Sequence, residues 1–81
     1  MKNKTSIERS SLVHFGKRVR FFRNARGMSQ EELAEIANVH RTYIGMIERG
    51  EKNATLLTII RLANALNITA QEILKGIHNG E

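Results

Sequence analysis

Residues 28–50 read MSQEELAEIANVHRTYIGMIERG. Ser29 followed three residues later by Glu32 forms a capping box, in which the hydroxyl accepts from a backbone N–H and the carboxylate reaches back to the helix start. This signal predicts a short helix that ends at Asn38, since asparagine tolerates the left-handed conformation of a turn. A second helix is predicted from about Arg41. The apolar residues of the two helices and their joint are spaced to form one shared core: Leu33, Ala37, Val39, Ile44 and Ile47.

The joint between these two helices is short, with about three or four residues including Asn38. Such a joint holds two helices at roughly 90–120°, which is the helix-turn-helix geometry. Ala34 fits this arrangement, because a small side chain is needed where the helices approach closely. The ordered set of turn, small and apolar residues between two capping signals predicts a helix-turn-helix unit.

Helices are also predicted on both sides of this unit. On its N-terminal side, apolar residues step by three and four, which predicts a helix over about residues 11–26. On its C-terminal side, Thr55 can cap a fourth helix. A second capping box, made by Thr69 and Glu72, opens a fifth helix over about residues 70–77. Because strand-like alternation is absent, the chain is predicted to be all-α with five helices.

The charge of the chain points to a polyanionic partner. Its net charge is +5, from 13 basic and 8 acidic residues. Residues 1–26 hold eight of the basic side chains and one of the acidic ones. A solvated helix face or an amphipathic helix on a membrane surface would also fit this asymmetry, so the charge alone leaves the partner open.

Several classes of function are excluded by what the chain lacks. Its 81 residues fit one small domain, and without cysteine it forms neither a disulfide framework nor a thiolate metal site. His14, His40 and His78 have no ligand spacing, so neither a metal nor a cofactor is expected. The sequence has neither a paired-carboxylate constellation nor a glycine-rich phosphate loop, so an enzyme is not expected. No apolar run is long enough for a membrane span, and no signal peptide is present, so a cytoplasmic protein is expected.

Several motifs in and around the helix-turn-helix unit match one known family. They are MSQEELA (28–34), Val39, YI (43–44), IERG (47–50), TL (55–56) and LANALNI (62–68). Together they resemble the phage repressor/Cro-like (XRE-type) helix-turn-helix family over nearly the whole chain. Two departures are Asn38, which replaces the usual turn glycine, and Ala54, which stands where proline is frequent. Within the family, RTYIG at residues 41–45, with Asn53 and Thr55, is similar to the controller proteins of restriction–modification systems.

The resemblance implies a compact five-helix repressor-like DNA-binding domain over residues 11–77, with a C-terminal dimerisation helix. Residues 1–10 are then an N-terminal extension, flexible or ordered, and residues 78–81 a tail. The helix that begins near Arg41 is expected in the major groove of DNA. The residues expected to read bases are Arg41, Thr42, Tyr43 and Met46. The residues expected to contact phosphate are Gln30, Arg49, Lys52, Asn53 and Thr55.

The chemistry of these side chains suits the roles that the resemblance implies. Arginine can donate two hydrogen bonds to guanine O6 and N7, and threonine offers both a hydroxyl and a methyl group. Each position also has a structural alternative. Arg41 could be a plain exposed arginine, Thr42 a helix cap, and Tyr43 a cover for the core edge. Gln30 could belong to the capping turn alone, and residues 49–55 could form an ordinary polar loop.

Arg23 is set apart from the DNA-contacting arginines, because the resemblance pairs it with Glu48. In the family, an acidic residue at the position of Glu48 faces the first helix and pairs with an arginine at the position of Arg23. Such a pair would fix the recognition helix against the first helix. Loss of either partner would leave a part-buried charge behind.

The expected partners are double-stranded DNA with a pseudo-palindromic operator and a second copy of the chain. A homodimer follows because two recognition helices roughly 34–36 Å apart can read both half-sites. The interface candidates are Leu57, Ile60, Asn64, Ile68, Ile73 and Ile77. RNA polymerase is a candidate partner, whereas no membrane or small-molecule ligand is expected. The predicted function is sequence-specific transcriptional regulation as a restriction–modification controller, with a phage-type repressor or an antitoxin-like autoregulator as the alternative.

Overall fold

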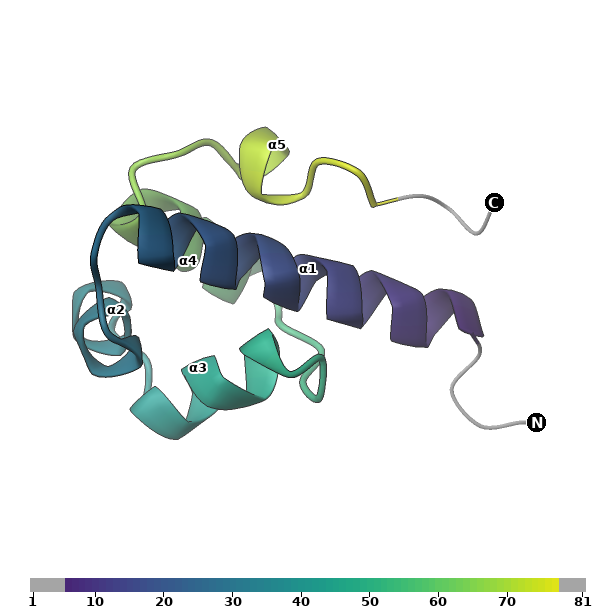
Figure 1. Ribbon diagram of the computed structural model, residues 1–81, viewed down its shortest axis with the longest axis horizontal. Coiled ribbons are helices and arrows are strands. Elements are labelled where there is room, and N and C mark those ends of the chain that lie inside the picture. Colours follow the sequence, from purple (N-terminus) through teal and green to yellow (C-terminus); the bar gives the residue numbers. More distant parts are fainter. Residues whose placement is uncertain (1–5, 78–81) are drawn as a thin grey trace.

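The part of the chain that the structure describes forms five helices that enclose one hydrophobic core (Figure 1). The computed structural model describes the backbone of residues 6–77 and the side chains of residues 8–77. The helices are α1 (Ser6–Ala25), α2 (Gln30–Ala37), α3 (Arg41–Glu48), α4 (Leu56–Ala65) and α5 (Ala70–Ile73). In the view of Figure 1, α3 lies below α1, α5 above it and α4 behind it. The described residues contain no strand, which confirms the all-α prediction.

The first helix is longer than predicted. It begins at Ser6 rather than near residue 11, so residues 6–10 belong to the helix. Glu8 in the first turn favours this earlier start, because a carboxylate stabilises the positive end of the helix dipole. Although α1 has 20 residues, neither it nor any other helix within the described part is apolar enough to cross a membrane. Residues 1–5 and the predicted tail, residues 78–81, lie outside the described residues.

The turn between α2 and α3 has the predicted conformation. Ser29 and Glu32 form the capping box at the start of α2, with both reciprocal hydrogen bonds present. Asn38 adopts the left-handed conformation, with φ 60° and ψ 47°, and ends the helix. His40 then caps α3, since its Nδ1 accepts from the backbone N–H of Thr42 over 3.1 Å. Local capping chemistry therefore ends α2 at Asn38 and begins α3 after His40.

The last helix is shorter than predicted. It ends at Ile73, and residues 74–76 form turns. The hydroxyl of Thr69 caps the helix, but the carboxylate of Glu72 pairs with Arg18 of α1 over 3.1 Å and does not complete a capping box. Gly76, at φ +89°, packs so closely on α1 that an added Cβ would lie 2.7 Å from the Nε2 of His14. Contacts with α1 therefore end the helix early.

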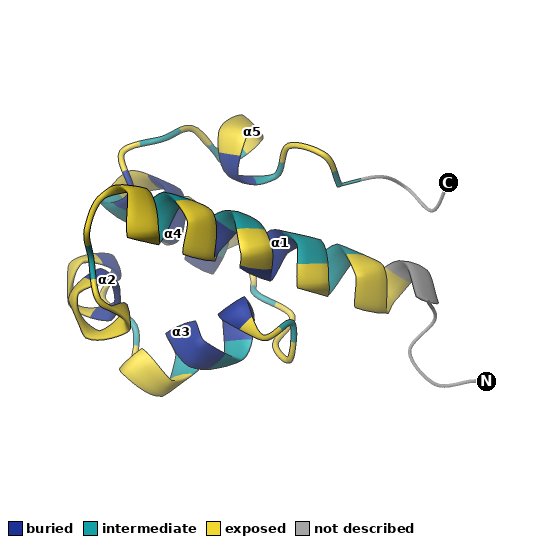
Figure 2. Cartoon of the chain, in the orientation of Figure 1, coloured by how far each residue is buried: buried dark blue, intermediate teal, exposed yellow. Residues whose placement is uncertain are grey.

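The core lies between the helices and contains the apolar residues predicted for the helix-turn-helix unit, whereas Leu56 and Ile60 on the apolar side of α4 are exposed. Figure 2 shows the buried segments facing one another across the interior. Burial of a leucine or isoleucine contributes about 1.5–3 kcal/mol relative to exposure, so this small core accounts for much of the favourable free energy of folding. Its buried residues are Phe15, Val19, Leu33, Ala34, Ala37, Ile44, Ile47, Leu62, Ala63, Leu66 and Ile73, and the half-buried Val39 packs against them.

A glycine on α1 lets this helix touch the end of α3. A Cβ added at Gly16 would lie 2.3 Å from the carbonyl oxygen of Ile47 and 2.9 Å from that of Glu48. Any other residue at this position would push the two helices apart. The backbone of α1 is therefore the surface against which the helix expected to contact DNA is positioned.

Candidate nucleic-acid interface

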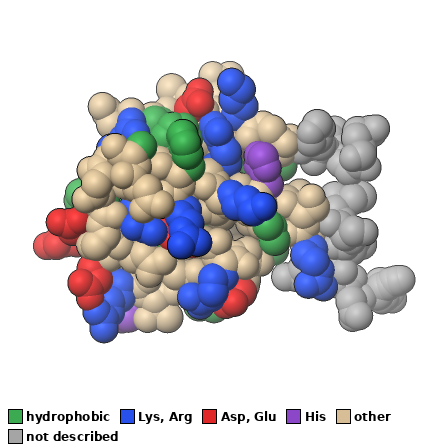
Figure 3. All heavy atoms as spheres, viewed as in Figure 1, with side chains coloured by type: hydrophobic (Ala, Val, Ile, Leu, Met, Phe, Trp, Pro, Cys, Tyr) green, Lys and Arg blue, Asp and Glu red, His purple; other side chains and the backbone are tan. Residues whose placement is uncertain are grey.

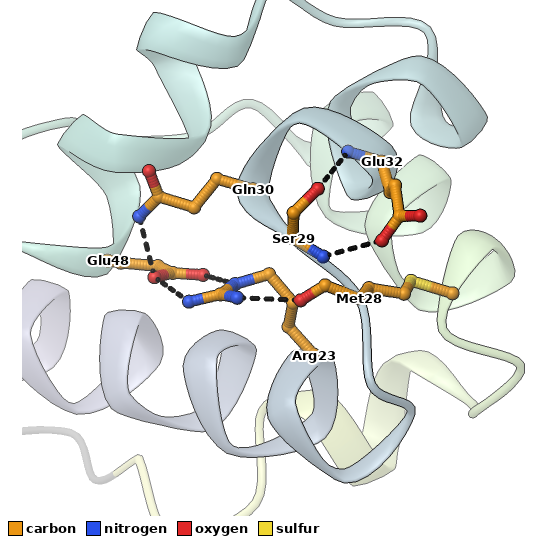
Figure 4. Close-up of polar contacts among 6 residues, drawn as sticks. All are labelled: Arg23, Met28, Ser29, Gln30, Glu32 and Glu48. Atoms are coloured by element: carbon orange, nitrogen blue, oxygen red, sulfur yellow. Dashed lines mark hydrogen bonds and ion pairs between the residues drawn. The ribbon is translucent and has the colours of Figure 1, made fainter.

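One ion pair joins α1 to α3 beneath the candidate interface (Figure 4). Arg23 donates from Nε to Glu48 Oε2 over 2.6 Å and from Nη2 to Oε1 over 3.0 Å, while its Nη1 donates to the carbonyl of Met28 over 2.8 Å. The Glu48 side chain is only 3% exposed, and that of Arg23 is 11% exposed. The hydrogen bond to Glu48 raises the pKa of Arg23, against the opposing effect of burial. The predicted pair is thus present, and it occupies the guanidinium of Arg23 within the protein.

Gln30 at the start of α2 joins the same carboxylate. Its Nε2 donates to Glu48 Oε1 over 3.0 Å, as Figure 4 shows. Gly45 of α3 faces the side chain of Gln30, since an added Cβ would lie 3.6 Å from its Oε1 and 3.1 Å from Arg49 Nη1. The absence of a side chain at Gly45 therefore lets Gln30 and Arg49 converge over α3.

A surface cavity of about 570 Å³ lies where the first turns of α2 and α3 meet. It brings together two residues predicted to read bases, Arg41 and Thr42, and two predicted to contact phosphate, Gln30 and Arg49. Tyr43, Met46 and the rest of the loop after α3 do not line it. The lining residues are Arg23, Ser29, Gln30, Glu31, Arg41, Thr42, Gly45 and Arg49.

Arg41 and Thr42 lie exposed in the first turn of α3. Arg41 Nη1 pairs with Glu31 of α2, and both side chains are more than half exposed. Exposed pairs of this kind contribute at most about 1 kcal/mol, so Arg41 can leave Glu31 for another partner. Because His40 caps α3, the capping alternative for Thr42 does not hold. Glu31 could not be identified as this partner from the sequence, since the pairing depends on the angle between the two helices.

Tyr43 and Met46 are both half-buried. Tyr43 packs against the core, as its structural alternative proposed, and the ammonium group of Lys52 lies 5.6 Å from the centre of its ring. This contact is a cation–π interaction that holds Lys52 beside α3. Tyr43 and Met46 are therefore partly packed within the protein, next to the exposed Arg41 and Thr42.

The loop after α3 carries the other predicted phosphate contacts. Arg49 donates from Nε and Nη2 to the two carboxylate oxygens of Glu51, over 2.9 and 3.2 Å. These hydrogen bonds raise the pKa of Arg49 and lower that of Glu51. Asn53 is exposed, whereas the hydroxyl of Thr55 accepts from the backbone N–H of Thr58 and donates to its side-chain oxygen. The hydroxyl proton of Thr55 is thus already used within the protein.

The candidates for a dimer interface fall into three groups. Leu57, Ile60 and Asn64 are exposed on α4, with Leu57 64% exposed. Ile68 and Ile77 are half-buried against the core. Ile73 is completely buried and presents no surface to a partner, so its place among these candidates is wrong. Ile73 is the last residue of α5, and its side chain packs into the hydrophobic core.

Two exposed apolar residues extend the surface of α4 beyond the predicted set. Leu56 is 68% exposed, and Ile36 of α2 is 58% exposed. Ile36 lines a cavity of about 300 Å³ that continues to Asn64 of α4. Ile36 could have been found from the sequence, because it is the apolar residue of α2 that lies off the buried positions 33, 34 and 37.

Basic side chains are spread over the face seen in Figure 3, and acidic side chains lie beside some of them. Within the described residues, no group of three His, Cys, Asp or Glu side chains is placed to bind a metal ion.

The helix-turn-helix family model matches residues 19–73, which is well over half of the chain. This chain belongs to the helix-turn-helix family.

The relatives within this family include controller proteins. Control protein C.SmaI of Serratia marcescens is 52% identical over 63 residues, which cover 75% of this chain and 75% of that protein. Control protein C.BamHI of Bacillus amyloliquefaciens is 43% identical over 61 residues, which cover 74% and 75%. The solved structure of the restriction-modification controller protein C.AhdI from Aeromonas hydrophila has a TM-score of 0.78 and 45% identity, covering 79% of this chain and 97% of that one.

The similarity extends from the sequence to the fold. The predicted family and the five-helix fold are therefore confirmed, and this helix-turn-helix protein is a DNA-binding transcriptional regulator similar to controller proteins. The prediction that it is not an enzyme is confirmed by the same family assignment. Within this fold, α2 and α3 are the helix-turn-helix unit, and α3 is the second helix, which enters the major groove in proteins of this type.

Proposed function

We propose that this regulator is the controller of a restriction–modification system, acting in the cytoplasm as a homodimer on a pseudo-palindromic operator. The observation that carries the proposal is the convergence of Gln30, Arg41, Thr42 and Arg49 on one surface cavity at the start of α3. The similarity to Control protein C.SmaI supports the restriction–modification role. In this role the protein acts on transcription through the operator that it occupies, with RNA polymerase as the neighbouring partner.

Base recognition is assigned to the exposed first turn of α3. Arg41 reaches a guanine edge with two donors once its weak surface pair with Glu31 is exchanged. Thr42 presents its hydroxyl and methyl groups beside it. Tyr43 follows in the same turn and Met46 lies about one turn further along, and only the outer parts of these half-buried side chains reach DNA. The sequence preference of the protein thus depends mainly on Arg41 and Thr42.

Phosphate binding is assigned to the two sides of the recognition helix. Gln30 is held by Glu48 with its amide oxygen and one N–H left over, and it can contact phosphate next to the groove. Arg49, Lys52 and Asn53 follow α3 in an exposed loop. At Thr55, the contact would come from the backbone at the start of α4, since the hydroxyl proton is bonded to Thr58. These contacts position the helix and carry no sequence information.

Dimerisation is assigned to the exposed apolar side of α4. Leu57, Ile60 and Asn64 are exposed on this helix, and the half-buried Ile68 and Ile77 complete the candidate set. Exposed apolar residues that gather in this way mark interaction surfaces. The dimer would place two copies of α3 one DNA turn apart, roughly 34–36 Å, so that each reads one half-site.

The experiment that tests the proposal is the selection of binding sites from random double-stranded DNA. The proposal expects an inverted repeat whose half-sites are about one helical turn apart. It also expects that repeat upstream of neighbouring endonuclease and methyltransferase genes. A single unrepeated site would contradict the homodimeric reading of DNA, and a repeat beside toxin or prophage genes would contradict the restriction–modification role.

A further inference from the structure

Arg49, the residue that follows α3, is already paired within the protein. Its Nε and Nη2 donate to the two carboxylate oxygens of Glu51 over 2.9 and 3.2 Å. These two nitrogens form an edge of the guanidinium that can grip a carboxylate or a phosphate with parallel hydrogen bonds. Both side chains are more than half exposed. The edge that Arg49 would offer to a phosphate is therefore held by a carboxylate at the protein surface.

The backbone of the loop places Glu51 next to Arg49. Gly50 has φ +75°, and an added Cβ there would lie 2.9 Å from a methyl carbon of Val13 on α1. The backbone N–H of Glu51 donates to the carbonyl of Met46 over 2.8 Å. A packed glycine turn and a backbone hydrogen bond thus hold the carboxylate close to the guanidinium.

The rest of the Arg49 guanidinium lies toward the candidate interface. Its Nη1 is 3.1 Å from the position that a Cβ would take at Gly45, and Arg49 lines the same cavity as Gln30 and Arg41. The hydrogen bonds between Arg49 and Glu51 lower the pKa of the Glu51 carboxyl group and raise the pKa of the Arg49 guanidinium. Both groups are charged at neutral pH, so a phosphate that approaches Arg49 meets an existing anionic partner.

We propose that Glu51 is an intramolecular competitor of DNA phosphate for Arg49. This inference rests on the phosphate contact of Arg49 in the proposed function. Each binding event exchanges a carboxylate–arginine pair for a phosphate–arginine pair, whatever the base sequence. Glu51 therefore lowers the affinity for every DNA sequence by the same factor and leaves the preference between sequences unchanged. It sets the concentration at which the regulator occupies DNA, while the base contacts choose the site.

The test measures binding of the full chain by fluorescence anisotropy at neutral pH and low salt. Two duplexes of equal length are used, one selected by the protein from random sequences and one with that sequence scrambled. Glu51→Gln is expected to tighten binding to both duplexes roughly two- to fivefold, the range set by weak exposed ion pairs. Glu35→Gln removes the same charge from an exposed position on α2 and is the matched control, with a smaller effect expected.

The same measurement in variants of Arg49 separates local competition from a general effect of charge. Arg49→Gln is expected to weaken binding to both duplexes, and in this background Glu51→Gln is expected to tighten binding no more than Glu35→Gln does. In the wild-type protein, added duplex is expected to shift the carboxyl ¹³C resonance of Glu51 toward its position in Arg49→Gln. This shift reports release of the pair directly.

Three results would overturn the inference. Tightening by Glu51→Gln that does not exceed the Glu35→Gln control would show that the pair does not compete with DNA. Tightening of full size in the Arg49→Gln background would show that the carboxylate acts only through its charge at a distance. Unchanged binding in Arg49→Gln alone would overturn the proposed phosphate contact, and the competition with it.

Discussion

Arg23 of α1 and Glu48 of α3 form two hydrogen bonds, of 2.6 and 3.0 Å, beneath the surface that faces DNA in the proposed function. Glu48 also accepts from Gln30 of α2, so one carboxylate joins three helices. The pair lies behind the recognition residues and does not compete with DNA for them. These hydrogen bonds hold α3 against α1 and α2 in the protein without DNA.

Removal of this carboxylate is expected to destabilise the fold. Glu48→Gln leaves a part-buried guanidinium without its anion, and the expected loss is about 2–4 kcal/mol in the free energy of unfolding. Urea denaturation followed by circular dichroism measures it. The control is Glu72→Gln, which removes the pair with Arg18, in which the two side chains are 46% and 20% exposed. It is expected to cost less, because Arg18 keeps its hydrogen bond to the backbone carbonyl of Glu72. Equal losses in the two variants would contradict the structural role of Glu48.

A methyl group at Gly16 is expected to disturb the contact between α1 and α3. Alanine has the higher helix propensity, yet Gly16→Ala places a carbon 2.3 Å from the carbonyl oxygen of Ile47, so a loss of about 1–3 kcal/mol in the free energy of unfolding is expected. Lys17→Ala, at the exposed neighbouring position, is the control. Urea denaturation that finds Gly16→Ala as stable as the wild type would show that the two backbones are not in contact.

The carboxyl group of Glu51 is expected to titrate below the ordinary pH range of glutamate. Hydrogen bonds from Arg49 lower its pKa in the folded state, so the pair stabilises the fold above the pKa of the unfolded chain. That contribution is lost as the pH falls through the lower folded-state pKa. Carbon-13 NMR titration measures the pKa of the Glu51 carboxyl group. Both Arg49→Gln and high salt are expected to return this pKa toward the ordinary value for glutamate. A titration unaffected by Arg49→Gln would show that the pair does not persist in solution.

A charge on the apolar side of α4 is expected to separate the dimer. Leu57→Asp places a carboxylate at a 64% exposed leucine, and burying that charge in an interface opposes association. Sedimentation at micromolar concentration is expected to show a dimer for the wild type and a monomer for the variant. Phe21→Asp, at a 63% exposed position on α1, is the matched control and should remain a dimer. If Phe21→Asp dissociates and Leu57→Asp does not, the interface lies on α1.

Local signals account for the parts of the fold that could be predicted from the sequence. The capping box at Ser29 and the left-handed Asn38 involve neighbouring residues only, and both have the predicted geometry. The missing capping box at the start of α5 could not be predicted, because the carboxylate of Glu72 pairs with Arg18, which is 54 positions away in the sequence. The exposure of Ile36, in contrast, could be predicted, because this residue lies off the buried positions 33, 34 and 37 of α2.

In the candidate site too, features set by neighbouring residues could be predicted, and contacts between distant residues could not. The positions of Arg41 and Arg49 in and after α3 follow from the helix boundaries, which local patterns predict. Their partners, Glu31 and Glu51, depend on the crossing of two helices and on a glycine turn packed against α1. The sequence therefore identified the basic residues but not the carboxylates that hold them in the free protein.

Sequence preference is proposed to depend on Arg41, although residues 27–55 around it hold five acidic and three basic side chains. The most direct test compares Arg41→Ala with Lys52→Ala on a selected and a scrambled duplex over a range of salt concentrations. Arg41→Ala is expected to cost about 1–3 kcal/mol on the selected duplex and little on the scrambled one. Lys52→Ala is expected to weaken both equally and to reduce the salt slope by about one. Equal losses on both duplexes for Arg41→Ala would contradict the claim.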